Sequence, residues 1–480
     1  MSEPGHMDAN VSKLKQELCQ GKISRREFIR SMALLGLSLG MSEILTACSM
    51  EETSGATSRF LPWRTDIDNK LATEPYETLV VPTFTPVPDV PVIKSSPTPI
   101  PRKQINWLCG ACGERFRTRD EFNKHAGREH SWRLPEIIRV ERPTYSEFLK
   151  GPVTRFDERN TVFSRTLWDD EYKSLVKEAA AKTQPDDLEA IEGRALVAGA
   201  IYVDNTAGAL HPNYGGYMGH VRNDNGLYGW DDPINSEQFL VSDPAWMSER
   251  IKTVAHFYGA NLVGITEVNP RWIYSHYFER ASGAYGNLEI PYRYAIVMGV
   301  EMNWKWINES PGAEASAATA LAYSQMAELS ASMAKYIRAL GYAAIPCGND
   351  TAQSIPLAID AGLGELGRNG LLISPEYGPR QRICKVFTDL PLQTDQPIDF
   401  GMRSFCETCH ACAAACPANA IRWEERTTEQ TSISNRPGIM RWPVNVTACY
   451  LFWTENGFDC SNCVAACPWA LHSQRDWLEL

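Results

Sequence analysis

Residues 406–417 read CETCHACAAACP, and cysteine thiolates are preferred ligands of iron and other soft metals. Four cysteines and a closing proline follow the spacing C-x2-C-x2-C-x3-C-P: Cys406, Cys409, Cys412, Cys416 and Pro417. Bacterial ferredoxins use this spacing to hold [4Fe–4S] cubanes. The motif therefore predicts an iron–sulfur cluster in this part of the chain.

A second cysteine set follows, and it consists of Cys449, Cys460, Cys463 and Cys467. In two-cluster ferredoxins one cysteine of each motif crosses to the other cluster. This rule assigns the first [4Fe–4S] cluster to Cys406, Cys409, Cys412 and Cys467, and the second to Cys416, Cys449, Cys460 and Cys463. Zinc or disulfides are the alternatives, and the two Cys-Pro endings and the short spacings disfavour disulfides. Eight thiolates predict a carrier of single electrons.

A different metal is indicated upstream, in CGACGERFRTRDEFNKHAGREH. Two cysteines and two histidines have the spacing of a tetrahedral zinc site: Cys109, Cys112, His125 and His130. A finger of this kind often reads DNA, and Thr118, Glu121 and Lys124 would occupy the base-reading positions. An exported chain meets no genome, so we expect a structural or protein-contact module and no nucleic-acid partner.

The N-terminus carries a predicted export signal, which supports the expectation that the finger does not bind nucleic acid. SRREFIR at 24–30 precedes the apolar stretch 31–48, a pattern typical of a twin-arginine export signal; a short amphipathic helix is the alternative. The stretch ends in LTAC at Cys48, where either lipidation of the cysteine or ordinary cleavage nearby would fit. We expect export in the folded state to the outer face of the cytoplasmic membrane, with Cys48 as the candidate lipid anchor.

Length and composition bound the remaining organisation. The chain has 480 residues, 44% hydrophobic and 22% charged, with a net charge of -11, which describes a globular protein of several domains. Val-Pro and Thr-Pro steps at 75–101 predict an extended linker. The predicted division is a signal at 1–48, a proline-rich linker at 49–101, a zinc-finger-like module at 102–134, a catalytic domain at 135–395 and a ferredoxin-like domain at 396–480.

The catalytic domain alternates helical and strand patterns. Residues 245–259 and 313–340 predict helices, the second with Leu329, Met333, Tyr336 and Leu340 on one face. Residues 261–268 and 292–302 predict buried strands, and GYAAIPCGND at 341–350 predicts a strand that runs into a loop. The expected fold class is therefore α/β or α+β.

From about residue 150 onward, the chain resembles the corrinoid-dependent reductive dehalogenases. The resemblance rests on the two cluster motifs and on these segments: 155–165, 260–275, 292–302, 340–350 and 355–392. It implies a nitroreductase-like domain that binds a base-off corrinoid, followed by the two-cubane domain. It also implies that electrons pass through the clusters to cobalt, that halide is removed from an organohalide, and that the enzyme is the terminal reductase of organohalide respiration. The finger and its linker depart from the family pattern.

Three polar residues match family positions: Tyr323 in AYSQM, Asn349 in CGND and Arg382 in GPRQR. The resemblance makes Tyr323 the proton donor, with Arg382 as the permanent cation that favours its phenolate and Asn349 as the orienting amide. Without the resemblance, Tyr323 would be a core tyrosine, Arg382 a member of a surface ion pair and Asn349 a turn residue. Arg380 stands two positions away and is the alternative if the register differs.

The family also implies partners: an organohalide substrate, a small integral-membrane anchor protein and an electron-donating respiratory partner. Two other functions stay open. One is an epoxyqueuosine reductase, which uses a corrinoid and two cubanes on tRNA, although the export signal and the net charge argue against it. The other is an exported electron carrier or corrinoid-binding protein without catalysis.

Overall fold

The computed structural model describes residues 107–108, 115–116, 137–183, 188–206, 227–280 and 282–470. All of these belong to one unit of the chain, Pro97–Leu480. The predicted export signal, Cys48, the proline-rich linker and the four predicted zinc ligands lie outside the described residues. The domain boundaries proposed from the sequence therefore remain predictions.

A four-stranded sheet forms the centre of the domain predicted at 135–395. Its order is β4 (Leu262–Glu267), β7 (Tyr294–Glu301), β11 (Gln381–Thr388) and β8 (Ala344–Cys347). Every neighbouring pair in this sheet is antiparallel. The sheet therefore has the α+β form of the predicted mixed class.

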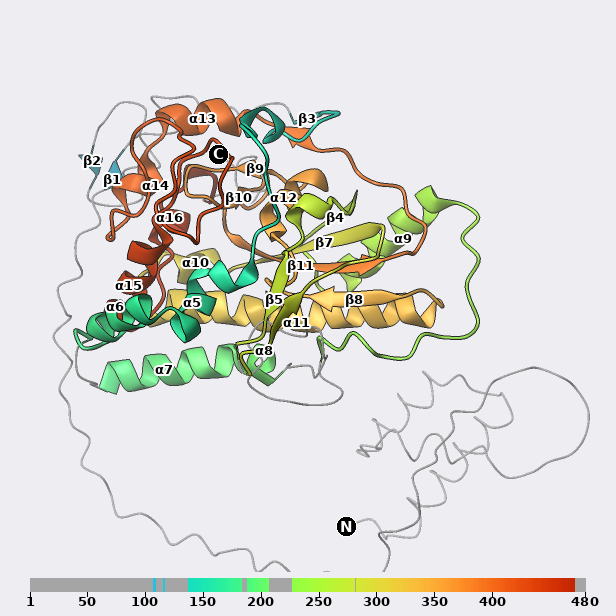
Figure 1. Ribbon diagram of the computed structural model, residues 1–480, viewed down its shortest axis with the longest axis horizontal. Coiled ribbons are helices and arrows are strands. Elements are labelled where there is room, and N and C mark those ends of the chain that lie inside the picture. Colours follow the sequence, from blue (N-terminus) through green and yellow to red (C-terminus); the bar gives the residue numbers. More distant parts are fainter. Residues whose placement is uncertain are drawn as a thin grey trace, which may run out of the picture. The chain divides into compact units, whose positions relative to one another are not determined.

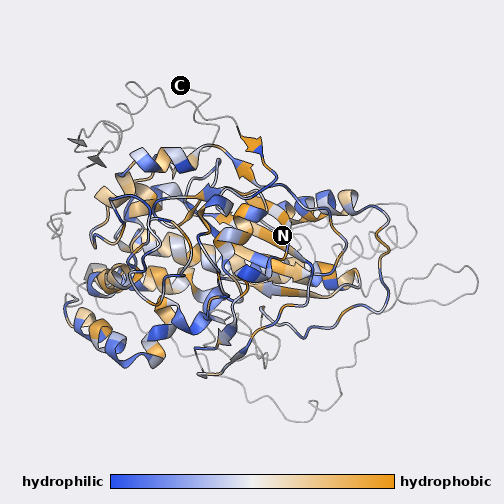
Figure 2. Ribbon diagram, turned by 45° about the horizontal axis from the view of Figure 1, so that its top comes forward, coloured by the Kyte–Doolittle hydropathy of each residue, from blue (hydrophilic) through white to orange (hydrophobic). Residues whose placement is uncertain are grey.

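Both faces of the sheet are buried, and the alternation of side chains along β7 divides them between two cores. Successive side chains on a strand point to opposite faces. Tyr294, Ile296 and Met298 accordingly pack in one core, and Ala295 and Val297 pack in the other. In Figure 2 the central strands carry hydrophobic residues over most of their length, whereas the surrounding helices mix both kinds.

Helices cover the two faces of the sheet (Figure 1). The long helix α11 (Ala313–Ala339) and α9 (Pro244–Phe257) contribute to the first core, and α12 (Ser354–Asp360) contributes to the second. The alanine content of α11 favours a helix and allows close approach to the strands. Helix α9 begins at Asp243, whose carboxylate accepts hydrogen bonds from the Ala245 and Trp246 amides.

The predicted cluster-binding region folds into four short helices: α13 (Met402–Thr408), α14 (Ala411–Ala414), α15 (Val446–Asn456) and α16 (Asn462–Ala465). Cys406 lies on α13, Cys412 on α14, Cys449 on α15 and Cys463 on α16. Hairpin β9–β10 (Glu365–Leu366 and Leu372–Ile373) belongs to the domain predicted at 135–395 and packs through Ile373 against Phe400, Met402 and Cys467.

Further described helices are α5 (Val162–Trp168), α6 (Asp170–Ala180), α7 (Leu188–Ala200), α8 (Tyr202–Thr206) and α10 (Trp304–Ile307). Further strands are β1 (Trp107–Leu108), β2 (Arg115–Phe116), β3 (Ile138–Arg139), β5 (His276–Phe278), β6 (Tyr285–Asn287) and β12 (Ile398–Asp399). Single 3-10 turns occupy Ser146–Phe148, Glu158–Asn160, Pro270–Trp272 and Pro468–Ala470.

The elements expected from the sequence are confirmed with small changes at their ends. The helix predicted at 245–259 is α9, and the helix predicted at 313–340 is α11. The strands predicted at 261–268 and 292–302 are β4 and β7, and the predicted strand before the CGND loop is β8. In the part of the chain that the structure describes, no helix combines the length and apolar character needed to span a membrane.

Candidate active site and cluster-binding cysteines

Tyr323, Asn349 and Arg382 meet although they are distant in sequence. The Asn349 side-chain amide donates a hydrogen bond to the Tyr323 hydroxyl at 2.8 Å. The guanidinium of Arg382 lies over the Tyr323 ring, 4.9 Å from its centroid. Because the hydroxyl is the acceptor in the bond with Asn349, that bond does not use the tyrosine's own proton. The arrangement places a fixed cation beside a phenol that can donate.

Three different elements position these side chains. Tyr323 lies on α11, Arg382 lies on β11 opposite Val300 of β7, and Asn349 lies in the loop after β8. Helix α11 packs on the face of the sheet to which alternate residues of β11 point, and the helix and this end of the strand therefore meet. The Arg382 Nε atom is buried and has no hydrogen-bond partner among the described residues. A buried donor left in this state indicates a position where a ligand atom can accept.

A buried lysine fixes the loop that carries Asn349. Lys385 of β11 is fully buried, and its ammonium donates to the carbonyls of Gly348 at 2.6 Å and Asp350 at 2.7 Å. It also donates to Ser354 Oγ at 3.0 Å. Burial lowers the pKa of Lys385, and the nearby Asp350 carboxylate opposes that change. Lys385 thus ties β11 to the Asn349 loop by polar bonds inside the core.

Asp350 completes this buried polar group. Its carboxylate accepts hydrogen bonds from the Gly348 amide at 3.1 Å and the Thr351 hydroxyl at 2.6 Å. Burial raises the pKa of Asp350, whereas Lys385 acts to lower it. Thr351 has a φ of 69°, a left-handed conformation that is uncommon for a β-branched residue. The buried pair Lys385 and Asp350 was not identified from the sequence. The signal that could have found it is a charged lysine within the otherwise apolar strand ICKVF.

A cavity of about 420 Å³ adjoins this site. Its volume lies within the range of about 300–1,000 Å³ that is usual for ligand pockets. Asn349 and Arg382 belong to its lining, together with Tyr274, Leu371 and Arg436. Apolar side chains predominate in the wall, and a few charged groups interrupt them. This combination suits an organic ligand whose orientation is fixed by a small number of polar contacts.

Two residues of the cavity wall, Tyr145 and Trp272, form a buried hydrogen-bonded group with Asp360. The Tyr145 hydroxyl donates to Asp360 Oδ1 at 2.5 Å and accepts from Trp272 Nε1 at 2.9 Å. Burial raises the pKa of Asp360 to about 7. The Arg436 guanidinium lies 4.7 Å from the centre of the Trp272 ring, and burial with Arg271 and Arg441 nearby lowers the pKa of Arg436 to about 10. Arg436 Nε also has no hydrogen-bond partner among the described residues.

The cysteines of the first predicted cluster lie together. Cys406, Cys409, Cys412 and Cys467 are all buried and line one small cavity. Burial raises the pKa of the Cys412 thiol well above its usual range, and Cys409, Cys467 and Cys406 raise it further. Four mutually repelling thiolates inside a protein need a cationic centre, and the iron atoms of a cluster supply one.

The second set also comes together. Burial raises the pKa of Cys449 to about 12, with Cys460 and Cys416 as its neighbouring thiols. Cys463 has Cys449, Cys460 and Cys416 around it, and Cys412 of the first set acts on it as well. The two sets are therefore adjacent. The Ala420 amide donates to Cys416 Sγ at 3.2 Å, a bond of the kind that tunes cluster potentials.

Sites for one metal ion are a separate matter. Within the described ranges, no three His, Cys, Asp or Glu side chains are arranged to hold a single ion. A cubane differs because it takes one thiolate at each of its irons. The four predicted zinc ligands lie outside those ranges, and only the strand pair around Cys109 and Cys112 is described: Trp107 pairs with Phe116, and Leu108 pairs with Arg115.

The choice between Arg380 and Arg382 is decided by their contacts. Arg380 is buried and forms an ion pair with Glu301, and it donates to the carbonyls of Met302 and Ala470. These contacts join β11 to β7 and to the C-terminal region. Arg380 is thus the ion-paired structural arginine, and Arg382 is the one that contacts Tyr323.

Comparison with known proteins identifies the C-terminal part. Residues 405–471 match the family model described as a 4Fe-4S dicluster domain. This match covers all eight cysteines assigned to the clusters, from Cys406 to Cys467.

The larger part is similar to reductive dehalogenases. A tetrachloroethene reductive dehalogenase of Desulfitobacterium hafniense is 38% identical over 291 residues, which is 51% of this chain and 53% of that protein. The tetrachloroethene reductive dehalogenase of Sulfurospirillum multivorans is 33% identical over 326 residues, 60% of this chain and 64% of that protein. A solved reductive dehalogenase, described in terms of B12-dependent dehalogenation, has a TM-score of 0.51 at 25% identity and covers 70% of this chain and 44% of that one.

The chain spans between about half and two thirds of the length of these two curated relatives. The predicted fold class is confirmed by the solved structure and by the family model. The described part of the chain thus combines a domain with the fold of the reductive dehalogenases and a 4Fe-4S dicluster domain.

Proposed function

We propose that the protein is a corrinoid- and iron–sulfur-dependent reductive dehalogenase that replaces a halogen of an organohalide by hydrogen, or removes two halides from neighbouring carbons. The observation that carries this proposal is the contact of Tyr323 with Asn349 and Arg382 beside a cavity in the described region. The similarity to two tetrachloroethene reductive dehalogenases supports it.

The three residues divide the work of proton delivery. Replacement of halogen by hydrogen consumes two electrons and one proton and releases halide. Tyr323 donates the proton from its hydroxyl, and Asn349 keeps that hydroxyl in place. Arg382 stabilises the phenolate that remains, because a permanent positive charge lies over the ring.

The cavity fits a corrinoid by the chemistry of its wall. It combines apolar faces with the unpartnered donors of Arg382 and Arg436, which suit a large ring bearing amide and phosphate oxygens. Tyr274, Leu371 and Arg436 are among the residues that would hold it. When bound, a corrinoid would supply a strongly reducing cobalt centre for the reductive cleavage of a carbon–halogen bond. The adjacent cysteine sets would provide the route by which electrons arrive.

The test is Tyr323→Phe, because it removes the hydroxyl and keeps the ring under Arg382. We expect halide release to fall about 10²- to 10⁴-fold, as is usual for loss of a positioned proton donor. Cobalt and iron content should stay at wild-type levels. Tyr336→Phe is the matched control, since Tyr336 lies on the same helix and packs against the same core.

Equal activity of Tyr323→Phe and Tyr336→Phe would place the proton donor elsewhere. Loss of corrinoid from Tyr323→Phe alone would show that the tyrosine serves binding or packing instead.

The proposal extends to location and partners. Export by the twin-arginine route, the candidate lipid anchor at Cys48, a small membrane anchor protein and a respiratory electron donor all follow from the sequence motifs and the family resemblance. A structural zinc held by Cys109, Cys112, His125 and His130 belongs to the same proposal. The antiparallel pairing of β1 and β2 supports it, because two strands joined across Cys109 and Cys112 form the hairpin that such a site uses.

The alternatives rank lower. The two curated relatives described above each match more than half of this chain and carry the name of reductive dehalogenases, which favours that activity over epoxyqueuosine reduction. A carrier without catalysis would have no use for a tyrosine held between an amide and an arginine beside the cavity.

A further inference from the structure

Arg368 is a buried arginine at the junction of the catalytic domain and the cluster domain. It lies in the turn of hairpin β9–β10, two residues beyond β9, and is 2% exposed. Gly370, in the same turn, has a φ of 76°, which explains a glycine there. The hairpin thus presents a charged side chain directly to the segment that contains Cys406 and Cys409.

Main-chain carbonyls receive the hydrogen bonds of Arg368. Its Nε donates to Cys406 O at 3.0 Å and to Cys409 O at 3.1 Å. Its Nη2 donates to Cys406 O at 2.8 Å and Glu407 O at 3.2 Å. Its Nη1 donates to the carbonyls at 422–424, at 2.9, 3.1 and 3.3 Å. The guanidinium of Arg368 therefore fixes the segment 406–409 and also the neighbouring segment 422–424.

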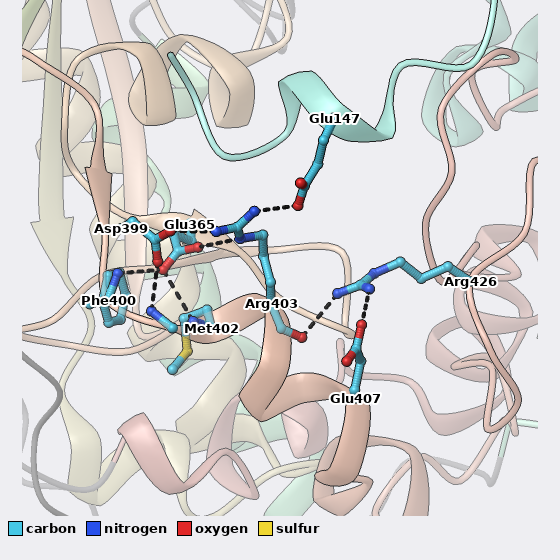
Figure 3. Close-up of polar contacts among 9 residues, drawn as sticks. Glu147, Glu365, Asp399, Phe400, Met402, Arg403, Glu407 and Arg426 are labelled. Atoms are coloured by element: carbon cyan, nitrogen blue, oxygen red, sulfur yellow. Dashed lines mark hydrogen bonds and ion pairs between the residues drawn. The ribbon is translucent and has the colours of Figure 1, made fainter. Parts of the chain in front are cut away.

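These carbonyls explain why an arginine suits the position. Helix α13 ends at Thr408, and the last carbonyls of a helix have no partner within it. A cation at this end also interacts favourably with the helix dipole. The same hairpin holds the start of α13, because Glu365 accepts hydrogen bonds from the amides of Phe400 at 2.8 Å and Met402 at 3.1 Å (Figure 3).

Arg368 has no carboxylate partner for its charge in the part of the chain that the structure describes. No Asp or Glu oxygen of the described residues lies within ion-pair distance of it, so the neighbouring thiols are its counter-charges: Cys412, Cys406 and Cys409. Arg426 offers a direct contrast. The two guanidiniums lie over the Trp442 ring, at 4.4 Å for Arg368 and 4.0 Å for Arg426. Arg426, however, forms an ion pair with Glu407 and also donates to Arg403 O (Figure 3).

We propose that Arg368 is a positioning residue for one of the two clusters: it holds the Cys406–Cys409 segment and raises the reduction potential of the cluster bound by Cys406, Cys409, Cys412 and Cys467. A cubane with four thiolates is anionic and gains a further negative charge on reduction. A fixed cation in a buried site stabilises the reduced form more than the oxidised form. The inference rests on the dicluster domain and not on the proposed dehalogenation.

The second cysteine set lacks an equivalent group in the described contacts. No arginine or lysine contacts this set in the described residues. Its polar neighbours are the Ala420 amide at Cys416, the Ser310 hydroxyl at Cys460 and the Asn369 side chain, which donates to Cys463 O at 3.5 Å, and the one charged group that acts on Cys460 among them is the Asp459 carboxylate. The second cluster therefore serves as an internal reference, because a change at Arg368 should shift the reduction potential of the first cluster and leave that of the second unchanged.

The experiment is a redox titration of both clusters by EPR in anaerobically purified full-length protein, with iron content measured in parallel. The variants are Arg368→Gln, which removes the charge, and Arg368→Lys, which keeps the charge but lacks the planar guanidinium. Arg426→Gln is the matched control, because it removes a guanidinium from the same tryptophan ring. We expect Arg368→Gln to shift one potential to a more negative value and Arg368→Lys to shift it less. Arg426→Gln should also shift it less than Arg368→Gln, because Arg426 acts on Cys406 but is paired with Glu407.

Unchanged potentials in Arg368→Gln with full iron content would overturn the proposal, and so would equal shifts of both clusters. If Arg368→Gln loses about half of the iron, the potential and the iron content of Arg368→Lys decide whether the charge of Arg368 acts on the cluster. A negative shift in that variant with its iron retained supports the proposal. An unshifted potential there, or loss of iron from both variants, would reduce Arg368 to a scaffold and overturn the electrostatic role.

Discussion

Asp360 shows how one buried carboxyl can make the stability of the fold depend on pH. It is 8% exposed, and Tyr145 donates to it at 2.5 Å. Burial raises its pKa from the usual 3.8 to about 7. The protonated form is thus favoured in the folded protein, and its contribution to stability is complete below about pH 4. That contribution is lost as the pH rises through about 7.

Asp360→Asn should remove this pH dependence while leaving an acceptor for Tyr145. At about 1.4 kcal/mol per pKa unit, the wild-type protein should lose at most about 4 kcal/mol from this group between about pH 4 and pH 7. The thermal midpoint of Asp360→Asn relative to wild type should therefore rise between pH 5 and pH 8. Thermal unfolding of both proteins across this range measures it, and a constant difference would show that Asp360 is ionised in the fold at all of these pH values.

At the scale of elements, the loop after β8 depends on a strand that is its neighbour only in space. Lys385 of β11 donates to the Gly348 and Asp350 carbonyls, and the Asp350 carboxylate lies nearby in the same buried group. The loop presents Asn349 to Tyr323, so the position of the amide depends on Lys385. Removing the lysine would leave carbonyls and a carboxylate buried without their cation.

Lys385→Met should destabilise the fold by about 2–5 kcal/mol, because the buried polar groups lose their donor. The double variant Lys385→Met, Asp350→Asn should recover part of this loss, since the unpaired carboxylate is gone. Urea unfolding followed by tryptophan fluorescence under anaerobic conditions provides the comparison. A single variant as stable as wild type, or a double variant no better than the single one, would contradict the role given to Lys385.

The sequence was sufficient where the signal is local. Helical spacing at Leu329, Met333 and Tyr336 predicted α11, and the cysteine spacings predicted two groups of four that the structure brings together. It was not sufficient where contacts join distant segments. The Tyr145–Asp360 bond spans 215 positions and the Arg368–Cys406 bond spans 38. No periodicity encodes such contacts, because they exist only after the sheet and the hairpin have packed.

Tyr323, Asn349 and Arg382 were identified by their match to family motifs, and hydrophobic periodicity or residue spacing would not have identified them. From spacing alone, Tyr323 is one of several tyrosines on or near the core face of α11, and Arg380 competes with Arg382. The structure separates them by their contacts, since Arg380 pairs with Glu301 and Arg382 lies over Tyr323. Two glycines beside Arg368, in GRNG, marked a turn but gave no indication that its arginine reaches the cluster segment.

At the scale of the whole molecule, the predicted zinc module should be separable from catalysis. His125→Ala with His130→Ala should release zinc and unfold that module, because so small a core depends on its metal. The proline-rich segment before it and the separate core of the catalytic domain should leave activity with an artificial electron donor unchanged. Retention in the membrane fraction should fall.

Elemental analysis and activity in extract check this prediction, and wild type should contain about one zinc atom per chain in addition to about eight iron atoms and one cobalt. Loss of activity with iron and corrinoid retained would make the module part of the active site. Unchanged membrane retention would remove the docking role.

The most direct test of the central claim is halide release by the anaerobically purified holoprotein supplied with reduced methyl viologen. The substrates are a panel of chlorinated ethenes, chlorinated ethanes and halogenated arenes, and protein without corrinoid is the control. We predict that at least one compound yields halide together with its dehalogenated product, and that release ceases without corrinoid. Protein that carries its full iron and corrinoid yet releases no halide from any compound in the panel would contradict the account.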